Sequence, residues 1–167
     1  MATYKLNTES IDKLLKDVET LQNGIDDKLE RFCVEMARRG VLIAQNELQV
    51  VSAIDSGNLL NSIKLRRGDV TKYQCKYYIY TDCEYAKFVE FGTGVVGARN
   101  PHPDLSQANI DGGWTYDSHN HGEEGWVYED ENGNWHRTRG QASRPFMYNT
   151  KLKLEEIIEE VAREVFQ

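Results

Sequence analysis

Residues 84 to 103 read EYAKFVEFGTGVVGARNPHP, and this stretch sets a short helix directly before a glycine-rich loop. Tyr85, Phe88 and Val89 share one side of the helix expected over 84–91, which predicts that this side is buried. Gly92 is a natural residue to end that helix. A phosphate-binding loop precedes its helix and uses the positive end of the helix dipole. Because this loop follows a helix, its glycines indicate a structural loop.

The chain upstream of this stretch predicts helices followed by strands. Apolar residues recur at helical spacing from 11 to 21, and Gly24 interrupts the pattern, so we expect a second amphipathic helix over about 25 to 51. Asp55 or Ser56 is expected to cap a single helical turn, with Gly57 at a tight bend. Two strands are expected near 62–68 and 72–81, joined by a turn at Gly68-Asp69.

The chain downstream predicts a long loop, a hairpin and a final helix. Segment 93–124 has little regular pattern, and a loop of this length is usually functional or mobile. Asn132-Gly133 between apolar residues predicts a β-hairpin. Its aromatic residues are expected to share one face: Trp126, Tyr128 and Trp135. In the last helix Ser143 is the expected cap and Pro145 suits the first turn, while the outer face is acidic.

These elements indicate an α+β fold in a single domain over 1–167. We expect a small antiparallel β-sheet packed with a long N-terminal helix and a C-terminal helix, plus a protruding β-hairpin and long loop. The expected parts are a helical extension over 1–24, a helix and sheet core over 25–92, the loop and hairpin over 93–142, and the last helix over 143–167.

Composition narrows the function classes. The net charge is −7 and the pI is about 5.1, which opposes nucleic-acid binding. An aromatic and basic interleaving around Trp135, Arg137 and Arg139 keeps a nucleic-acid module open as an alternative. Three cysteines without a C-x-x-C pair argue against a disulfide framework. The absence of an apolar leader and of a membrane-length apolar run predicts folding in a cytoplasm.

Catalysis is the less favoured class. His119-Asn120-His121, with His102 and Glu90, could serve a small metal-dependent hydrolase, because histidine is a common metal ligand. No H-E-x-x-H or C-x-x-C frames these residues, so exposed loop histidines are the simpler interpretation. There is no nucleophile elbow, and no second carboxylate is spaced to work with Glu90. We therefore expect no enzyme activity, no catalytic residues, no metal ligands and no cofactor.

Three elements together carry a resemblance to a known family. IDSGNLLNSI at 54–63, YAKFVEFGTG at 85–94 and RPFMYNTKLK at 144–153 occur in this order along the chain. They resemble the D-T-G-x-L-x-x-S-I, Y-A-x-x-V-E-F-G-T-G and R-P-F-[ML] elements of the lambdoid gene-ten-type minor structural proteins of tailed phages and prophages. The resemblance covers about 25 to 165. The long aromatic insertion after Gly94 departs from the shorter members of the family.

The resemblance implies a non-enzymatic virion protein of the neck or tail. It implies tail completion, which joins the tail tube to the head connector, with tail termination at the same junction as the alternative. The implied partners are further copies in a ring, a hexamer or similar, and the connector or stopper, tail terminator and tail tube proteins, without membrane or specific nucleic acid. The implied location is the virion, and the host bacterial cytoplasm during assembly.

Region 93–140 is expected to be the main contact with neighbouring subunits or partners, because a long loop beside an aromatic hairpin suits an adaptable interface. Glu90 is expected to make an inter-subunit or loop-fixing contact. The candidate interface residues are Glu90, Phe91, Gly92, Thr93, Gly94, Trp114, Trp126, Tyr128, Trp135, Arg137, Arg139 and Arg144.

Overall fold

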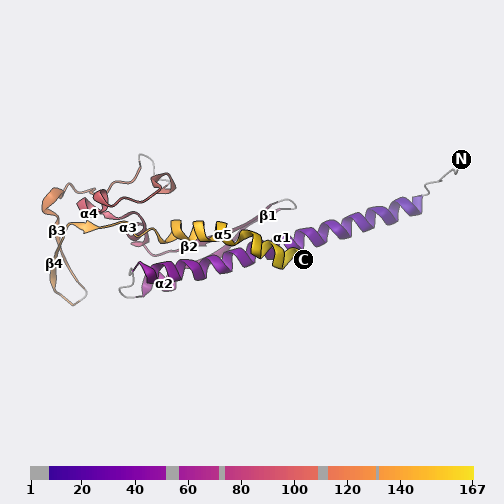
Figure 1. The fold of residues 1–167 in the computed structure, drawn as a ribbon, viewed down its shortest axis with the longest axis horizontal. Coiled ribbons are helices and arrows are strands. Elements are labelled where there is room, and N and C mark those ends of the chain that lie inside the picture. The colour runs from indigo at the N-terminus through magenta and orange to yellow at the C-terminus, as the bar shows by residue number, and fades with distance from the viewer. Residues whose placement is uncertain (1–7, 52–56, 72–73, 109–112, 131) are drawn as a thin grey trace.

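The computed structural model describes residues 8–51, 57–71, 74–108, 113–130 and 132–167, and it has the expected α+β fold (Figure 1). A long helix, a C-terminal helix and a β-ribbon form an elongated body, and a second ribbon lies at the far end from the N-terminus. The elements are α1 (Thr8–Val50), α2 (Asn58–Ser62), β1 (Lys64–Thr71), β2 (Gln74–Tyr80), α3 (Ala86–Phe91), α4 (Gly94–Arg99), the 3-10 turns η1 (Leu105–Ala108) and η2 (Gly122–Glu124), β3 (Trp126–Glu129), β4 (Trp135–Thr138), β5 (Gly140–Gln141) and α5 (Phe146–Phe166).

The expected break at Gly24 is wrong, because α1 runs through it as one helix of 43 residues. A glycine inside a helix costs only about 1 kcal/mol relative to alanine. The residues on both sides of Gly24 have good helical pattern, so the helix continues across it. A Cβ added at Gly24 would meet nothing within 4 Å, which means that the glycine is not required for close packing.

Gly24→Ala is expected to raise the free energy of local opening of the N-terminal half of α1 by about 0.5 to 1 kcal/mol. Alanine loses less backbone entropy than glycine in a helix and has open space here. Amide hydrogen exchange over 11–23 measures the effect. Gly40→Ala is the packed comparison and should gain less stability than Gly24→Ala, since its Cβ would meet the side chains of Ile79 and Leu154. Faster exchange in Gly24→Ala would show that the glycine serves a bend.

The core lies where α5 packs against the second half of α1 (Figure 1). Leu48, Phe146 and Val161 are at most 1% exposed. The two helices run antiparallel: Glu47 of α1 accepts a hydrogen bond from Asn149 near the start of α5, at 3.0 Å. At the other end, Lys28 Nζ donates to the backbone oxygen of Phe166, at 3.1 Å.

The first ribbon matches the two expected strands, which pair antiparallel with Leu65 opposite Ile79. The expected turn at Gly68-Asp69 is wrong, because both residues lie inside β1, where the pairing register shifts between Arg67 and Val70. A Cβ at Gly68 would lie 2.5 Å from Tyr78 Cε2, so the glycine leaves room for that ring.

The short helix and its glycine cap are as expected, but of the three residues expected on its buried side only Val89 is buried. Ala86 and Val89 are buried, whereas Tyr85 and Phe88 are 39% and 40% exposed. Tyr85 lies in the turn before α3, and its hydroxyl accepts a hydrogen bond from the Leu59 backbone at 3.1 Å. The helix therefore turns a different face to the core from the one that its larger residues indicated.

Further details of the sequence interpretation change in the structure. Segment 93–124 contains α4 and two 3-10 turns, so it is not a featureless loop. Ser143 is not a helix cap: α5 begins at Phe146, and the Ser143 hydroxyl donates to the Glu90 backbone oxygen. Gly57 has the left-handed φ of 76° expected of a tight bend, while Asp55 and Ser56 lie outside the described residues. Among the described helices, none combines the length and apolarity of a membrane span.

Candidate interaction site

The glycine-rich motif after α3 joins the helical body to the second ribbon. Gly92 ends α3 at φ 81°, and a Cβ there would lie 2.7 Å from the Ser143 nitrogen. Thr93 then bridges to Gln141, and Gly94 bridges to Gly140. Where Gly94 meets Gly140, the two backbone segments approach so closely that a Cβ on either glycine would clash with the other segment. The motif is a structural junction between two helices: Gly92 ends α3 as expected, but Gly94 also begins α4, which the sequence did not indicate.

Glu90 lies beneath this junction and is 7% exposed. Its Oε1 accepts hydrogen bonds from the Tyr148 backbone nitrogen and His102 Nε2, each at 3.0 Å. Its Oε2 accepts from the Met147 backbone nitrogen at 2.9 Å. The backbone nitrogens of Met147 and Tyr148 belong to the first turn of α5, where helix N–H groups lack internal partners. The carboxylate therefore caps α5 and fixes it to α3, which makes it a loop-fixing and helix-fixing residue inside the chain.

The hydrogen bonds define the tautomer of His102, which is 4% exposed. The Asp104 backbone nitrogen donates to its Nδ1 at 2.9 Å, so Nδ1 carries no proton. Nε2 then carries the proton and donates it to Glu90. The ring also packs against Phe91 and Tyr148, with centroids 4.8 and 5.3 Å away. His102 is thus a neutral core residue that anchors the loop after α4.

Aromatic and ionic contacts tie the loop to the same junction. Trp114 Nε1 donates to the Gly92 oxygen at 2.9 Å, and its ring lies 5.2 Å from that of Phe91. Glu123 forms ion pairs with Arg139 and with Arg99. Arg137 donates twice to the Glu124 oxygen, at 3.2 and 2.9 Å. The hairpin base is therefore held against α4 and η2 by arginines that the nucleic-acid alternative would use.

The hairpin forms as Asn132-Gly133 predicted, with Trp126–Glu129 paired to Trp135–Thr138. Asp130 accepts hydrogen bonds from the backbone nitrogens of Asn132 and Asn134, at 2.9 and 2.8 Å. His136 Nε2 also hydrogen-bonds its carboxylate at 2.8 Å. The His136 contact first, and then the Asn134 backbone, hold the pKa of Asp130 well below its usual range. The ionised carboxylate closes the turn.

The expected single aromatic face of the hairpin is wrong. Trp135 pairs with Glu129, while Trp126 pairs with Thr138 and Tyr128 with His136. Side chains alternate between the two faces of a strand. Trp135 therefore lies on the other face of the hairpin from Trp126 and Tyr128. It shares its face with Val127, and these two side chains are 69% and 57% exposed. This exposed pair, Val127 and Trp135, is here called the hairpin patch.

The histidines of the hydrolase alternative do not converge. His121 hydrogen-bonds Asp117 at 3.0 Å and its ring stacks on Trp126, with His119 beside it. The His121 and Gly122 backbone nitrogens lower the pKa of Asp117 to about 2. His102 is committed to Glu90 in the core. Within the described residues, no group of three potential metal ligands is present.

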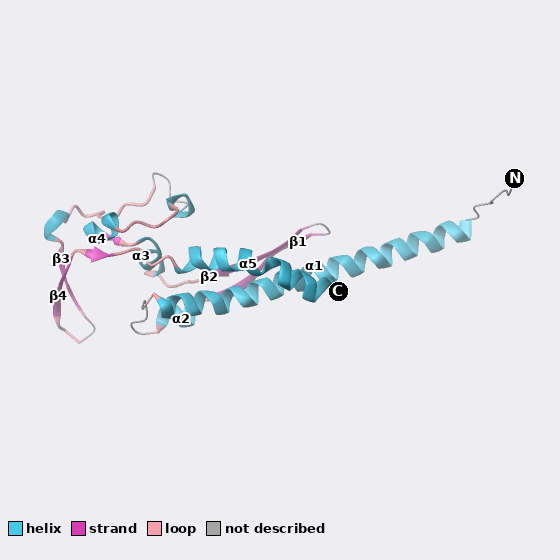
Figure 2. Cartoon of the chain, viewed as in Figure 1, coloured by secondary structure: helices cyan, strands magenta, loops and turns pink. Residues whose placement is uncertain are grey.

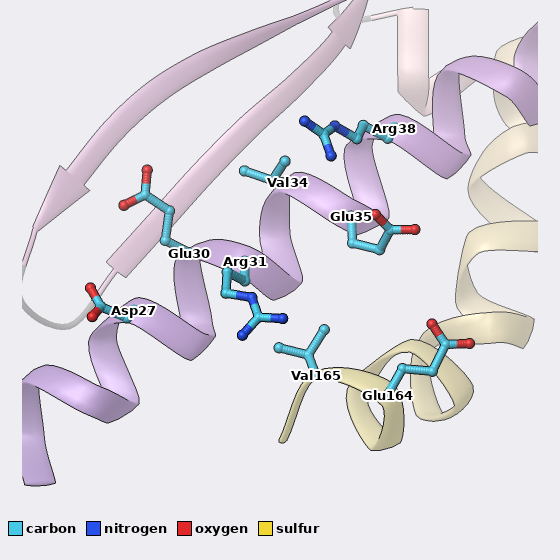
Figure 3. Close-up of a pocket in the computed structure, with 8 residues that line it drawn as sticks. All are labelled: Asp27, Glu30, Arg31, Val34, Glu35, Arg38, Glu164 and Val165. Carbon is cyan, nitrogen blue, oxygen red and sulfur yellow. The ribbon is translucent and has the colours of Figure 1, made fainter. Parts of the chain in front are cut away.

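An open groove of about 680 Å³ lies between α1 and the last turn of α5 (Figure 3). Its lining mixes acidic and basic side chains around Val34 and Val165. The groove holds carboxylates and guanidinium groups without a histidine, cysteine, serine or threonine. Three of its carboxylates are already ion-paired within the chain: Glu30 with Arg67, and Glu35 and Glu164 with Arg39.

The twelve candidate interface residues fall into three groups by exposure. Four are buried and shape the surface from beneath: Glu90, Phe91, Gly92 and Gly94. Four are half-buried: Thr93, Trp114, Trp126 and Arg144. Four are exposed: Tyr128, Trp135, Arg137 and Arg139. Sequence reasoning did not single out Val127, although its place beside an aromatic hairpin turn was a usable signal.

Comparison with known families bears on residues 12–92, which span most of α1, the first ribbon and α3. This segment matches the family described as "Bacteriophage HK97-gp10, putative tail-component". The matched segment covers just under half of the chain, so the comparison shows a likeness to this family over residues 12–92. The match agrees with the resemblance in IDSGNLLNSI and YAKFVEFGTG and supports a phage structural role. The match ends at Gly92, so the second ribbon and α5 lie outside it. Neither curated proteins nor solved structures gave a significant match.

Proposed function

We propose that this protein is a neck or tail completion protein that docks the tail tube to the head connector. The observation that carries the proposal is the HK97-gp10-like match over residues 12–92. The elongated shape supports it, because a docking protein must reach partners on two sides (Figure 2). The hairpin extends from one end of the body and α1 from the other.

A ring of copies is the arrangement that suits this role. A head-to-tail contact between unlike surfaces closes into a ring when its rotation permits. The hairpin patch supplies one such surface, since Val127 and Trp135 are exposed on one face of a paired hairpin. A buried tryptophan is a frequent anchor of protein interfaces. The neighbouring copy, the connector or stopper, the tail terminator and the tail tube are the partners proposed for it.

The double variant Val127→Ser with Trp135→Ala is expected to leave the protein folded but to lower infectious titre by at least about tenfold, because a central aromatic anchor contributes on the order of 2 kcal/mol to an interface. The measurement is complementation of a phage or prophage that lacks the gene. Glu155→Ala with Glu159→Ala on the exposed outer face of α5 is the control and should complement fully. Full complementation by the hairpin variant would remove the patch from the proposed interface.

Micrographs of particles that lack the protein test the role itself. Separate filled heads and tails of normal length are expected, because tail completion precedes joining but follows tail assembly. Overlong tails would instead assign tail termination. Normal infectious particles would overturn both roles.

A further inference from the structure

The N-terminal half of α1 presents an apolar stripe that no other described element covers. Figure 1 shows this half of the helix extending past the C-terminal end of α5. Six large apolar side chains on it are between 43% and 67% exposed: Ile11, Leu14, Leu15, Val18, Leu21 and Ile25. A contiguous exposed stripe of this size on a soluble protein marks an interaction surface.

The spacing of the stripe is that of a coiled-coil seam. Ile11, Leu14, Val18, Leu21 and Ile25 alternate steps of three and four residues, which is the a and d pattern of a heptad. The a positions hold β-branched residues and the d positions hold leucine. This combination favours two parallel strands over trimers or tetramers. The seam therefore specifies the kind of helix that covers it.

The stripe continues a face that is already packed on a helix. The next a position after Ile25 is Phe32, whose ring lies 6.1 Å from that of Phe166, the last residue of α5. Lys28 at the preceding d position bonds the Phe166 oxygen. One face of α1 is thus covered by α5 from this point onward. The same face of α1 continues toward the N-terminus, beyond the point where α5 ends.

The charges around the stripe permit an identical copy as the partner. Its flanking positions hold Leu15, Asp17, Gln22 and Gly24, with a single charge among them. Between residues 11 and 27 the remaining charged residues occupy the positions that point away from the seam in a heptad: Asp12, Lys13, Lys16, Glu19, Asp26 and Asp27. Two copies can therefore approach along the stripe without like charges facing each other, despite a net charge of −7 on each.

We propose that residues 11–25 of α1 pair with the same segment of a second copy, as a short parallel two-stranded coiled coil. The partner is another copy of this chain, and equal positions of the two copies face each other. The seam has five a and d positions, which makes the pair weak and dependent on concentration. The inference stands on the stripe alone and does not rest on the proposed role in the virion.

Site-specific cross-linking tests the pairing. Leu14→Cys should form a covalent dimer on mild oxidation, because a parallel seam sets residue 14 of one copy against residue 14 of the other. Lys16→Cys is the matched control, since position 16 points away from the seam and should link no more than wild type does through its three half-buried cysteines. Equal linking by the two variants, or none by Leu14→Cys, would overturn the proposal.

A second change separates this contact from any ring contact. Adding Leu21→Gln to the Leu14→Cys variant should lower the cross-link yield by about tenfold, since it removes a central leucine from the seam. Adding Asn23→Gln, on the opposite side of the helix, should leave the yield unchanged. Glutamine is a good helix former, so circular dichroism should show the helix intact in both. An unchanged yield with Leu21→Gln would contradict pairing through the stripe, whatever the ring does.

Discussion

Glu90→Ala is expected to lower the free energy of unfolding by about 3 kcal/mol or more, because it leaves buried donors without acceptors at about 1–3 kcal/mol each. The donors are His102 Nε2 and the backbone nitrogens of Met147 and Tyr148. His102 is fully enclosed at its side chain, so water cannot easily replace the lost carboxylate. The change also removes the cap of α5, the helix that covers the core half of α1.

Urea unfolding measures this loss, with two variants for comparison. Glu84→Ala removes an exposed glutamate just before α3, the helix that carries Glu90, and should change the free energy of unfolding by less than about 0.5 kcal/mol. Glu90→Gln should cost an intermediate amount. Its amide oxygen replaces one carboxylate oxygen, while its NH₂ group faces a donor at the other position. If Glu90→Ala had a free energy of unfolding within about 0.5 kcal/mol of the wild-type value, the role of Glu90 as the cap of α5 would be contradicted.

The sequence indicated either an inter-subunit or a loop-fixing contact for Glu90, but it could not name the residues that Glu90 contacts. The pattern of 84–91 and the glycine at 92 predicted the short helix from local rules alone. The contact to Met147 and Tyr148 joins residues 57 and 58 positions apart. Spacing along one chain carries no information about such a contact, because it depends on how α5 returns to α3.

The sequence assigned Trp135 to the wrong face of the hairpin because the number of residues in the hairpin loop was not known. The dipeptide Asn132-Gly133 predicted the hairpin, and the hairpin is there. Which side Trp135 takes depends on the number of residues in the loop, since a shift of one reverses every side chain. The pairing of Glu129 with Trp135 sets that number and puts the tryptophan on the open face.

Apolar residues at helical spacing over 11–21 and in the amphipathic pattern over about 25–51 form one stripe along α1, and the structure covers only part of it. The pattern alone cannot tell which stretch of the stripe is covered within the chain. The length of α5 decides this, since it ends at Phe166 beside Lys28. Residues 11–25 are left exposed by the geometry of another element, far away in the sequence.

Gly140→Ala is expected to cost about 3 kcal/mol, through backbone strain of about 1–2 kcal/mol and a steric clash of similar size. Gly140 has a φ of 95°, and an added Cβ would lie 1.9 Å from the Thr93 oxygen. The end of a flexible side chain could move away from the added Cβ. The Thr93 carbonyl cannot do so easily, because it belongs to the backbone that bridges to Gln141. The clash can be relieved only by separating the two segments that join the hairpin to the body.

Gly113→Ala separates the two causes, because Gly113 has a similar φ of 84° and an added Cβ there would meet nothing within 4 Å. It should cost only the strain, about 1–2 kcal/mol. Urea unfolding of both variants gives the difference, which measures the close approach at Thr93. A larger cost for Gly140→Ala means that the glycine crossing holds the hairpin in one direction. Equal costs would mean that the Thr93 segment moves aside freely, and the hairpin patch would then have no fixed orientation toward a partner.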